Sequence, residues 1–182
     1  EPIVISENLH LFAASDHLSN IETMSFDAVM EFRLKVTQLG ESYDFILIDC
    51  LPSFTLLQTA AHVAADFLLI PTELEDYSKD GVQKQIEKAV KIKNMYNPKL
   101  SVIGVFANKC SNPLTRLQDE YLGHIYDLVG DQLFENNINR ATRIGEAIAA
   151  RKPVSVYAPN SVSDVQFKQV TDELLKRIEG AA

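Results

Sequence analysis

The chain has 182 residues, of which 46% are hydrophobic and 23% are charged, and its formal net charge is −8. This composition suits one globular domain with a buried core and excludes a chain that is mainly disordered. No apolar run approaches the ~18 residues of a membrane span. The negative charge excludes a surface coated throughout with basic residues for nucleic acid, although it allows a local basic patch.

The two cysteines, Cys50 and Cys110, form no CxxC pair, and with the scattered histidines they make no zinc pattern. The first residues contain no basic stretch followed by an apolar one, so the sequence predicts no signal peptide. Isolated thiols in such a chain are expected to stay reduced. We therefore predict a cytoplasmic protein that does not bind a membrane.

Three short apolar runs predict strands, at residues 45–48, 67–70 and 102–107. None of them alternates apolar with polar residues, so each strand is predicted to be buried on both faces. Strands of this kind belong to parallel sheets that helices cover on both sides.

Amphipathic or apolar stretches around these strands predict helices, at residues 26–39, 55–63, 81–96, 113–129, 141–150 and 163–178. Gly40 is expected to end the first helix, Pro113 to open the fourth, and Ser163 to cap the last. Alternating strands and helices indicate βαβ units with right-handed crossovers. We therefore predict one α/β domain over residues 1–182, with a mostly parallel sheet and helices on both faces.

Ligands of such sheets bind at the carboxyl ends of the strands, and the strand at residues 45–48 runs directly into Asp49. A carboxylate at the mouth of a buried strand can help to hold a hydrated Mg²⁺ against nucleotide phosphates. Many parallel strands also end in Asp simply to cap the next helix, so the pattern alone leaves both readings open.

Residues 43–53, 64–73 and 75–81 extend this pattern. Together they resemble the ParA/MinD/Soj family of deviant Walker-type ATPases, in which the Walker B strand is followed by the two later segments. The resemblance implies that Asp49 is the catalytic Walker B carboxylate and holds Mg²⁺ through water. Leu51 departs from the family, which usually has the first of two prolines there, and we expect this to loosen the turn after the strand.

Further segments continue the resemblance in the family's order, at residues 9–15, 102–109, 134–147 and 152–161. It thus covers nearly the whole chain from Leu9 onward and implies a P-loop NTPase-like fold with ATP and Mg²⁺ as ligands. It places Asn108 and Lys109 near the adenine base, and an amide suits adenine because it offers both a donor and an acceptor. An ordinary Asn-Lys turn after a strand remains the alternative.

None of the seven glycines begins a GxxxxGK[ST] phosphate-binding loop. In the family this loop precedes the segment that matches residues 9–15, so the resemblance implies an N-terminally incomplete chain. Without the loop, the backbone N–H groups and the lysine that hold the phosphates are missing. We expect that the 182 residues alone do not hydrolyse ATP at a rate like that of the family, and enzyme activity stays open.

The resemblance also implies an ATP-bound homodimer that binds DNA non-specifically, a ParB-like partner protein, and association with the nucleoid. Arg140, Arg143, Arg151 and Lys152 lie close together along the chain, with Glu146 the only acidic residue among them. Such a patch can contact phosphates without reading bases, and Arg143 matches an arginine of the family's segment. A solvated helix face is the alternative.

Two other functions are weighed against a partition ATPase. One is a non-catalytic homologue that acts as an interaction module. The other is a MinD-like positioning ATPase, which the mixed charge of residues 172–182 disfavours, because a membrane-binding helix needs a basic face. Tyr77, Lys79 and Asp80 match a switch-like segment near the family's dimer interface, and their individual roles stay open.

Overall fold

A computed structural model describes residues 2–14, 25–51 and 55–181 of the chain. Ser15, His17, Pro52 and Ser53, which belong to the sequence patterns above, lie outside the described residues. The chain forms two compact units, Glu1–Ala65 and Asp66–Ala182, and each is described by itself.

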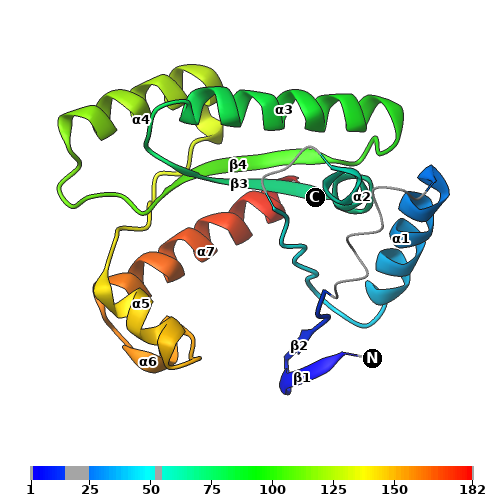
Figure 1. Cartoon of the computed structure of the whole chain (residues 1–182), viewed down its shortest axis with the longest axis horizontal. Coiled ribbons are helices and arrows are strands. Elements are labelled where there is room, and N and C mark those ends of the chain that lie inside the picture. Colours follow the sequence, from blue (N-terminus) through cyan, green and yellow to red (C-terminus); the bar gives the residue numbers. More distant parts are fainter. Residues whose placement is uncertain (1, 15–24, 52–54, 182) are drawn as a thin grey trace. The chain divides into compact units, whose positions relative to one another are not determined.

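The first unit contains a short antiparallel hairpin and two helices (Figure 1). Their bounds are β1, Ile3–Ser6; β2, Leu9–Leu11; α1, Phe26–Leu39; and α2, Leu56–Ala64. The predicted helix 26–39 is confirmed, with Gly40 at its C-cap, and Thr55 is the N-cap of α2. The two helices pack on each other. From strand β2, Nδ1 of His10 lies 2.6 Å from the hydroxyl of Tyr43.

The second unit is built on a βαβ crossover, and it is the part of the fold that the sequence predicted best. Its elements are β3, Phe67–Glu73; α3, Ser78–Met95; β4, Ser101–Asn108; α4, Arg116–Val129; a 3-10 helix η2, Gly130–Gln132; α5, Thr142–Ala149; α6, Val154–Tyr157; and α7, Val162–Ala181. Strands β3 and β4 pair in parallel, with Phe67 opposite Ser101 and Glu73 opposite Asn108. The strands predicted at residues 67–70 and 102–107 are therefore confirmed.

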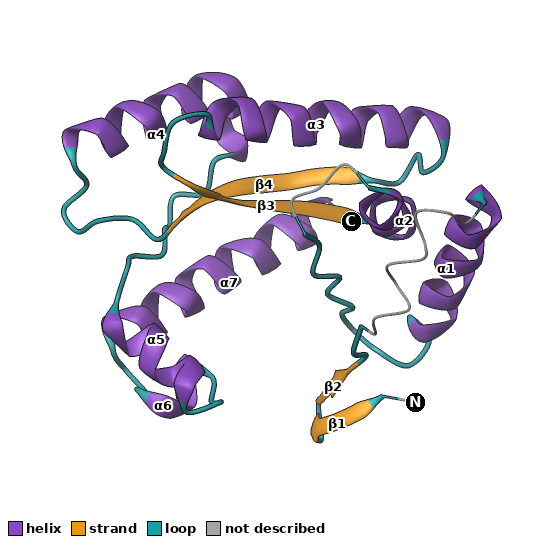
Figure 2. Cartoon of the chain, in the orientation of Figure 1, coloured by secondary structure: helices purple, strands orange, loops and turns teal. Residues whose placement is uncertain are grey.

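Helices cover both faces of this two-stranded sheet, as predicted. Figure 2 shows α3 and α4 along one face of β3 and β4 and α7 along the other. A core cluster with α3 and α4 is formed by Ile70, Leu74, Val82, Val105, Ala107, Cys110 and Ile125. A second cluster joins Phe106 to Phe134, Ile138 and Val170 of the opposite layer. Burying one side chain of this size stabilises the fold by ~1.5–3 kcal/mol, so the two clusters hold the layers together.

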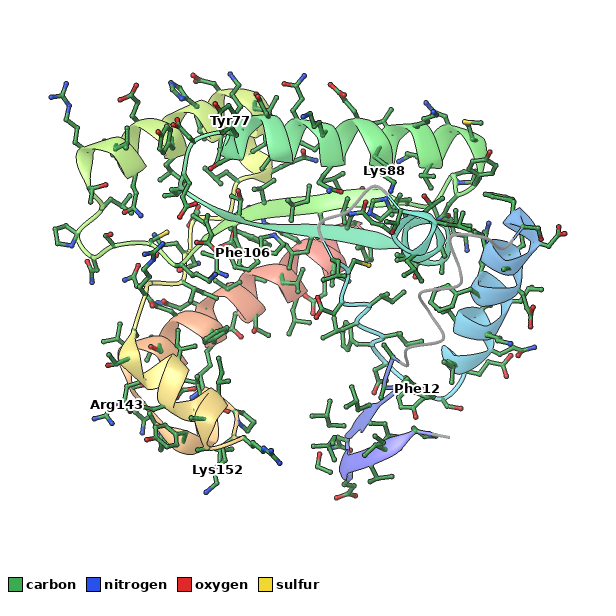
Figure 3. All side chains as sticks on the ribbon, in the orientation of Figure 1. Phe12, Tyr77, Lys88, Phe106, Arg143 and Lys152 are labelled. Carbon is green, nitrogen blue, oxygen red and sulfur yellow. The ribbon has the colours of Figure 1, made fainter. Side chains whose placement is uncertain are left out.

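Phe106 and Val105 show how one strand serves both layers. Side chains of successive strand residues point to opposite faces, so Val105 packs in the cluster with α3 and α4 while Phe106 faces the other way. Figure 3 shows Phe106 between β4 and α7. Both residues are buried, which explains why the sequence of this strand is apolar without alternation.

A polar network connects α7 to η2 and to the segment that follows it. The guanidinium of Arg177 donates hydrogen bonds to the carbonyl oxygens of Asp131 and Leu133, each at 3.0 Å, and lies over the ring of Phe134. One turn away, the Glu173 carboxylate accepts from the backbone N–H of Glu135 at 3.1 Å. This network orients the helix along the sheet, in addition to the apolar contacts.

Three helix starts differ from the predicted ones, and at each start the side-chain hydrogen bonds come from residues other than the predicted ones. Helix α3 begins at Ser78, whose hydroxyl donates to the Glu73 carbonyl at 2.6 Å, rather than at Gly81. Helix α4 begins at Arg116 rather than at Pro113, and its N-cap Thr115 forms a capping box with Gln118. At α7 the capping hydroxyl belongs to Ser161, which accepts from the N–H of Asp164 at 3.3 Å, and Ser163 is buried inside the helix. The prediction that Pro113 opens the fourth helix and the prediction that Ser163 caps the last helix are therefore wrong.

No helix in the described ranges is long and apolar enough to cross a membrane.

Candidate functional site

Asp49 lies in the first unit, at the end of a segment for which the strand prediction is wrong. Residues 45–48 are not part of any described strand, and Asp49 is exposed. Leu47 is 89% exposed, whereas the apolar run predicted burial on both faces. The physical reason is that a strand exists only with a hydrogen-bonded neighbour, and no described segment pairs with residues 45–48.

Asn108 and Lys109 lie where the sequence placed them, at the carboxyl end of β4. Asn108 is opposite Glu73, the last residue of β3. Its side-chain Oδ1 accepts a hydrogen bond from the backbone N–H of Lys109 at 2.9 Å. Lys109 itself has a φ of 54°, in the left-handed region that non-glycine residues seldom adopt. We call these two residues the Asn108–Lys109 corner.

Charged side chains from three segments meet beside this corner. The Lys109 ammonium pairs with the Glu73 carboxylate. Arg140 donates from Nε to the Lys109 carbonyl at 3.0 Å, and its Nη2 lies 3.6 Å from Glu73 and 3.4 Å from Glu75. Sequence reasoning missed Glu73 and Glu75, because they are distant from Lys109 and Arg140 along the chain. The only available signal was that both glutamates follow the apolar core of a strand.

Side chains of Ser78 and Tyr121 form hydrogen bonds with the loop between β3 and α3. The hydroxyl of Ser78 donates to backbone carbonyls of residues 73 and 75. The Tyr121 hydroxyl, from α4, donates to the Asp76 carboxylate at 2.7 Å, and that bond raises the pKa of Tyr121. Tyr77 has a φ of 67° and its side chain is 82% exposed. Lys79 and Asp80 follow in the first turn of α3.

Cys110, next to the corner, is fully buried. Burial raises the pKa of its thiol, while the positive charge of Arg140 opposes that rise. A buried thiol with a raised pKa is a poor nucleophile, so Cys110 is a core residue. Cys50 is exposed.

The four basic residues predicted as a patch separate into two kinds of environment. Arg140 belongs to the charged cluster at the corner, and Arg143 pairs with Glu146 at 3.0 Å. Arg151 and Lys152 are exposed, and among the described residues no carboxylate lies within ion-pair distance of either. Figure 3 shows Arg143 and Lys152 projecting from the α5–α6 segment.

The described residues offer no metal site built from protein side chains alone. Within residues 2–14, 25–51 and 55–181, no three His, Cys, Asp or Glu side chains gather as a metal site. Mg²⁺ commonly takes only one or two carboxylates and completes its shell with water and phosphate oxygens. An exposed single carboxylate such as Asp49 meets that need. At the corner, Asn108 keeps its side-chain NH₂ available as a donor, since Oδ1 is the atom that Lys109 contacts.

The chain has relatives of both known and unknown function. The model of the AAA domain family matches residues 1–102. An uncharacterised protein of Methanocaldococcus jannaschii is 30% identical over 181 residues, covering 97% of this chain and 70% of the relative. The chromosome-partitioning ATPase Soj of Treponema pallidum is 27% identical over 173 residues, and the match covers 93% of this chain and 68% of that relative. An uncharacterised protein of Mycobacterium tuberculosis is 31% identical, and the chain spans only 43% of its length.

Comparison with solved structures gives the fold. Cobyrinic acid a,c-diamide synthase of Mycobacterium smegmatis, with bound ATP analogue and magnesium, has a TM-score of 0.76 at 18% identity. The match covers 100% of this chain and 68% of that one, and it shows a P-loop NTPase-like α/β fold. The chain therefore belongs to the AAA domain family and, within it, is a relative of the Soj/ParA-type partition ATPases.

Proposed function

We propose that this protein binds ATP with Mg²⁺, forms a homodimer, and binds DNA non-specifically in the segregation of a replicon, together with a ParB-like partner. The observation that carries the proposal is the sequence match to a chromosome-partitioning ATPase along 93% of the chain. It is supported by the polar corner at the carboxyl end of β4, where ligands of parallel sheets bind. Its cellular location would be the cytoplasm, in association with the nucleoid.

Each predicted nucleotide residue has its own part in this proposal. For Asp49, whose carboxylate is exposed, we propose a contact to Mg²⁺ through water. For Asn108 we propose hydrogen bonding to the adenine base, because its side-chain NH₂ remains available while Oδ1 holds the Lys109 N–H. Lys109 supplies a positive charge beside the base, now balanced by Glu73. The bound nucleotide would supply the phosphoryl group for hydrolysis.

The test is nucleotide binding by the protein as its native host makes it. A fluorescent ATP analogue is titrated with Mg²⁺ and again with chelator, for the wild type, Asp49→Asn, and Glu41→Gln as an exposed control in the same unit. Loss of one charge-assisted contact should weaken the Mg²⁺-dependent affinity of Asp49→Asn about tenfold or more. Glu41→Gln should bind as the wild type does. No binding by the wild type, or equal binding by Asp49→Asn, would contradict the proposal.

For DNA binding we propose contacts from Arg143, Arg151 and Lys152, since all three are exposed. Figure 3 shows Arg143 and Lys152 projecting from the α5–α6 segment. Arg143 pairs with Glu146, so DNA phosphates must compete with that carboxylate. Neutralising one phosphate adds about 0.9 to the slope of log affinity against log salt. Arg143→Glu should therefore flatten this slope by about one unit.

Lys99→Glu is the matched control for Arg143→Glu, because it makes the same charge change at an exposed residue outside the patch. Its salt slope should stay that of the wild type. If both variants lose DNA affinity equally, the effect reflects net charge alone, and Arg143 is not a contact.

A further inference from the structure

The backbone of Arg140 joins its own segment to the end of β4. Its N–H donates to the Cys110 carbonyl at 2.8 Å, and the Cys110 N–H donates to Ile138 at 3.0 Å. Cys110 and Asn139 form a parallel bridge, so residues 138–140 continue the sheet beside the end of β4. The position of the Arg140 side chain is therefore fixed by the sheet and not by the helix α5 that follows.

The Arg140 guanidinium contacts the Asn108–Lys109 corner, the end of β3 and the loop that follows it. Nε donates to the Lys109 carbonyl at 3.0 Å, while Nη2 lies between the carboxylates of Glu73 and Glu75. Arginine presents its donors in a rigid planar fork, so the three contacts constrain one another. One side chain thus ties the corner to the strand opposite and to the loop that leads to Tyr77.

The corner needs such support because of its backbone. Lys109 occupies the left-handed region at a φ of 54°, which carries a conformational cost for a residue with a Cβ. The carbonyl of Lys109 is held by Arg140, and its N–H is held by Asn108. The orientation of the Asn108 amide therefore depends, through one peptide unit, on Arg140.

We infer that Arg140 is a positioning residue for nucleotide recognition by the Asn108–Lys109 corner, and not a DNA contact. This inference rests on the proposed function. A DNA phosphate would have to compete with two carboxylates and a carbonyl for the Arg140 guanidinium. Lys152, by contrast, is exposed and projects from the α5–α6 segment.

The test measures base selection, because a general loss of structure would weaken all nucleotides alike. Affinities for fluorescent ATP and GTP are determined for the protein as its native host makes it and for Arg140→Gln, Arg140→Lys and Lys99→Gln. Arg140→Gln should lower the ATP-to-GTP affinity ratio about tenfold, the worth of one misplaced hydrogen bond to the base. The ATP-to-GTP affinity ratio of Arg140→Lys should lie between those of the wild type and Arg140→Gln. An ammonium can pair with a carboxylate but cannot reproduce the planar fork of donors.

The matched control, Lys99→Gln, removes the same charge from an exposed residue outside the charged cluster and outside the proposed DNA patch, and it should leave the ratio unchanged. The Arg140 ion pairs are exposed, so Arg140→Gln should shift the unfolding temperature by less than about 4 °C. An unchanged ratio in Arg140→Gln would overturn the inference. So would a salt slope of DNA binding flattened by about one unit without any change in the ratio.

A second readout separates failure of the inference from failure of the proposed function. Hydrogen exchange of the Lys109 amide, which donates to Asn108, reports the corner directly. Arg140→Gln should accelerate that exchange about tenfold. If the wild type binds neither nucleotide, the proposed function is wrong and recognition by the corner is refuted with it. Unchanged exchange in Arg140→Gln refutes the positioning role even if the wild type binds ATP.

Discussion

Replacing Glu173 with alanine removes the centre of the network that fastens α7. The carboxylate accepts from the backbone N–H groups of Glu135 and Asn136 at 3.1 and 3.2 Å, and from Nδ2 of Asn136 at 2.9 Å. Nε and Nη2 of Arg177 donate to it at 3.2 and 2.8 Å. The change leaves two N–H groups and a guanidinium without their shared acceptor.

The size of the effect follows from how far the pair is removed from water. The side chains of Glu173 and Arg177 are 15% and 22% exposed. Removing one partner of a fully buried pair costs ~3–5 kcal/mol, and partial exposure screens part of this. Arg177 also keeps two carbonyl acceptors, those of Asp131 and Leu133. We expect a loss of about 3 kcal/mol, which lowers the unfolding temperature by roughly 9 °C in a chain of this size.

The assay is urea unfolding followed by circular dichroism, with Glu179→Ala as the control. Glu179 is an exposed carboxylate on the same helix, so its removal should change stability by less than about 0.5 kcal/mol. The midpoint of Glu173→Ala should fall while the slope against urea stays constant. A loss for Glu173→Ala no larger than that of the control would refute the argument that this network holds α7.

Acidification gives an independent check on the same carboxylate. Burial alone would raise the pKa of Glu173, but hydrogen bonds from Asn136, Arg177 and the Glu135 backbone outweigh it and hold the pKa below its ordinary value. The folded state therefore binds this proton less readily than the unfolded state. The stabilisation is present above the unfolded pKa and is lost as the pH falls through the folded pKa. The difference between wild type and Glu173→Ala should shrink over that range, and a difference independent of pH would contradict the assignment.

Two further predictions concern packing and capping. A Cβ at Gly104 would lie 2.7 Å from the carbonyl oxygen of Gln132. Gly104→Ala should therefore lower the free energy of unfolding, measured in urea, by about 1–3 kcal/mol. A variant as stable as the wild type would show that the η2 backbone moves freely. Thr115 accepts from the Gln118 N–H at 3.2 Å in the capping box of α4. Thr115→Ala should therefore cost about 1 kcal/mol, while Thr115→Ser should restore most of it; failure of serine to restore stability would refute the role of the hydroxyl.

The sheet of the second unit was predictable because its strands are buried on both faces. Val105 and Phe106 are adjacent and both lie in core clusters, so the apolar run is a direct record of burial. The same kind of run at residues 45–48 gave a wrong prediction. An apolar run indicates that a segment is to be buried, but it does not indicate which other strand forms hydrogen bonds with that segment.

Helix boundaries failed where several residues could serve as the cap. Ser161 and Ser163 are two residues apart, and both are acceptable N-cap residues by type. The choice is decided by Asp164, whose N–H meets Ser161 and whose carboxylate accepts from Asn160 at 2.8 Å. That geometry depends on the left-handed conformation of Asn160, which residue type alone suggests but does not fix.

The candidate site was predicted in position but not in its interactions. The end of a strand is readable from sequence, so Asn108 and Lys109 were found. The contacts of Lys109 with Glu73 and Arg140 depend on the parallel register of β3 and β4 and on the bridge at Cys110. Register between distant segments leaves no local signal in one sequence, and this is why Arg140 was grouped with its neighbours along the chain.

The unpaired side of β3 has a practical consequence for solution work. Among the described residues β3 pairs only with β4, and no backbone partner on its other side belongs to that part of the chain. An extended peptide of any origin can dock there by backbone hydrogen bonding, including the apolar residues 45–48 of a neighbouring molecule. We therefore expect that the 182-residue polypeptide self-associates as its concentration rises. Light scattering on each preparation is therefore the measurement that makes a titration of nucleotide or DNA interpretable.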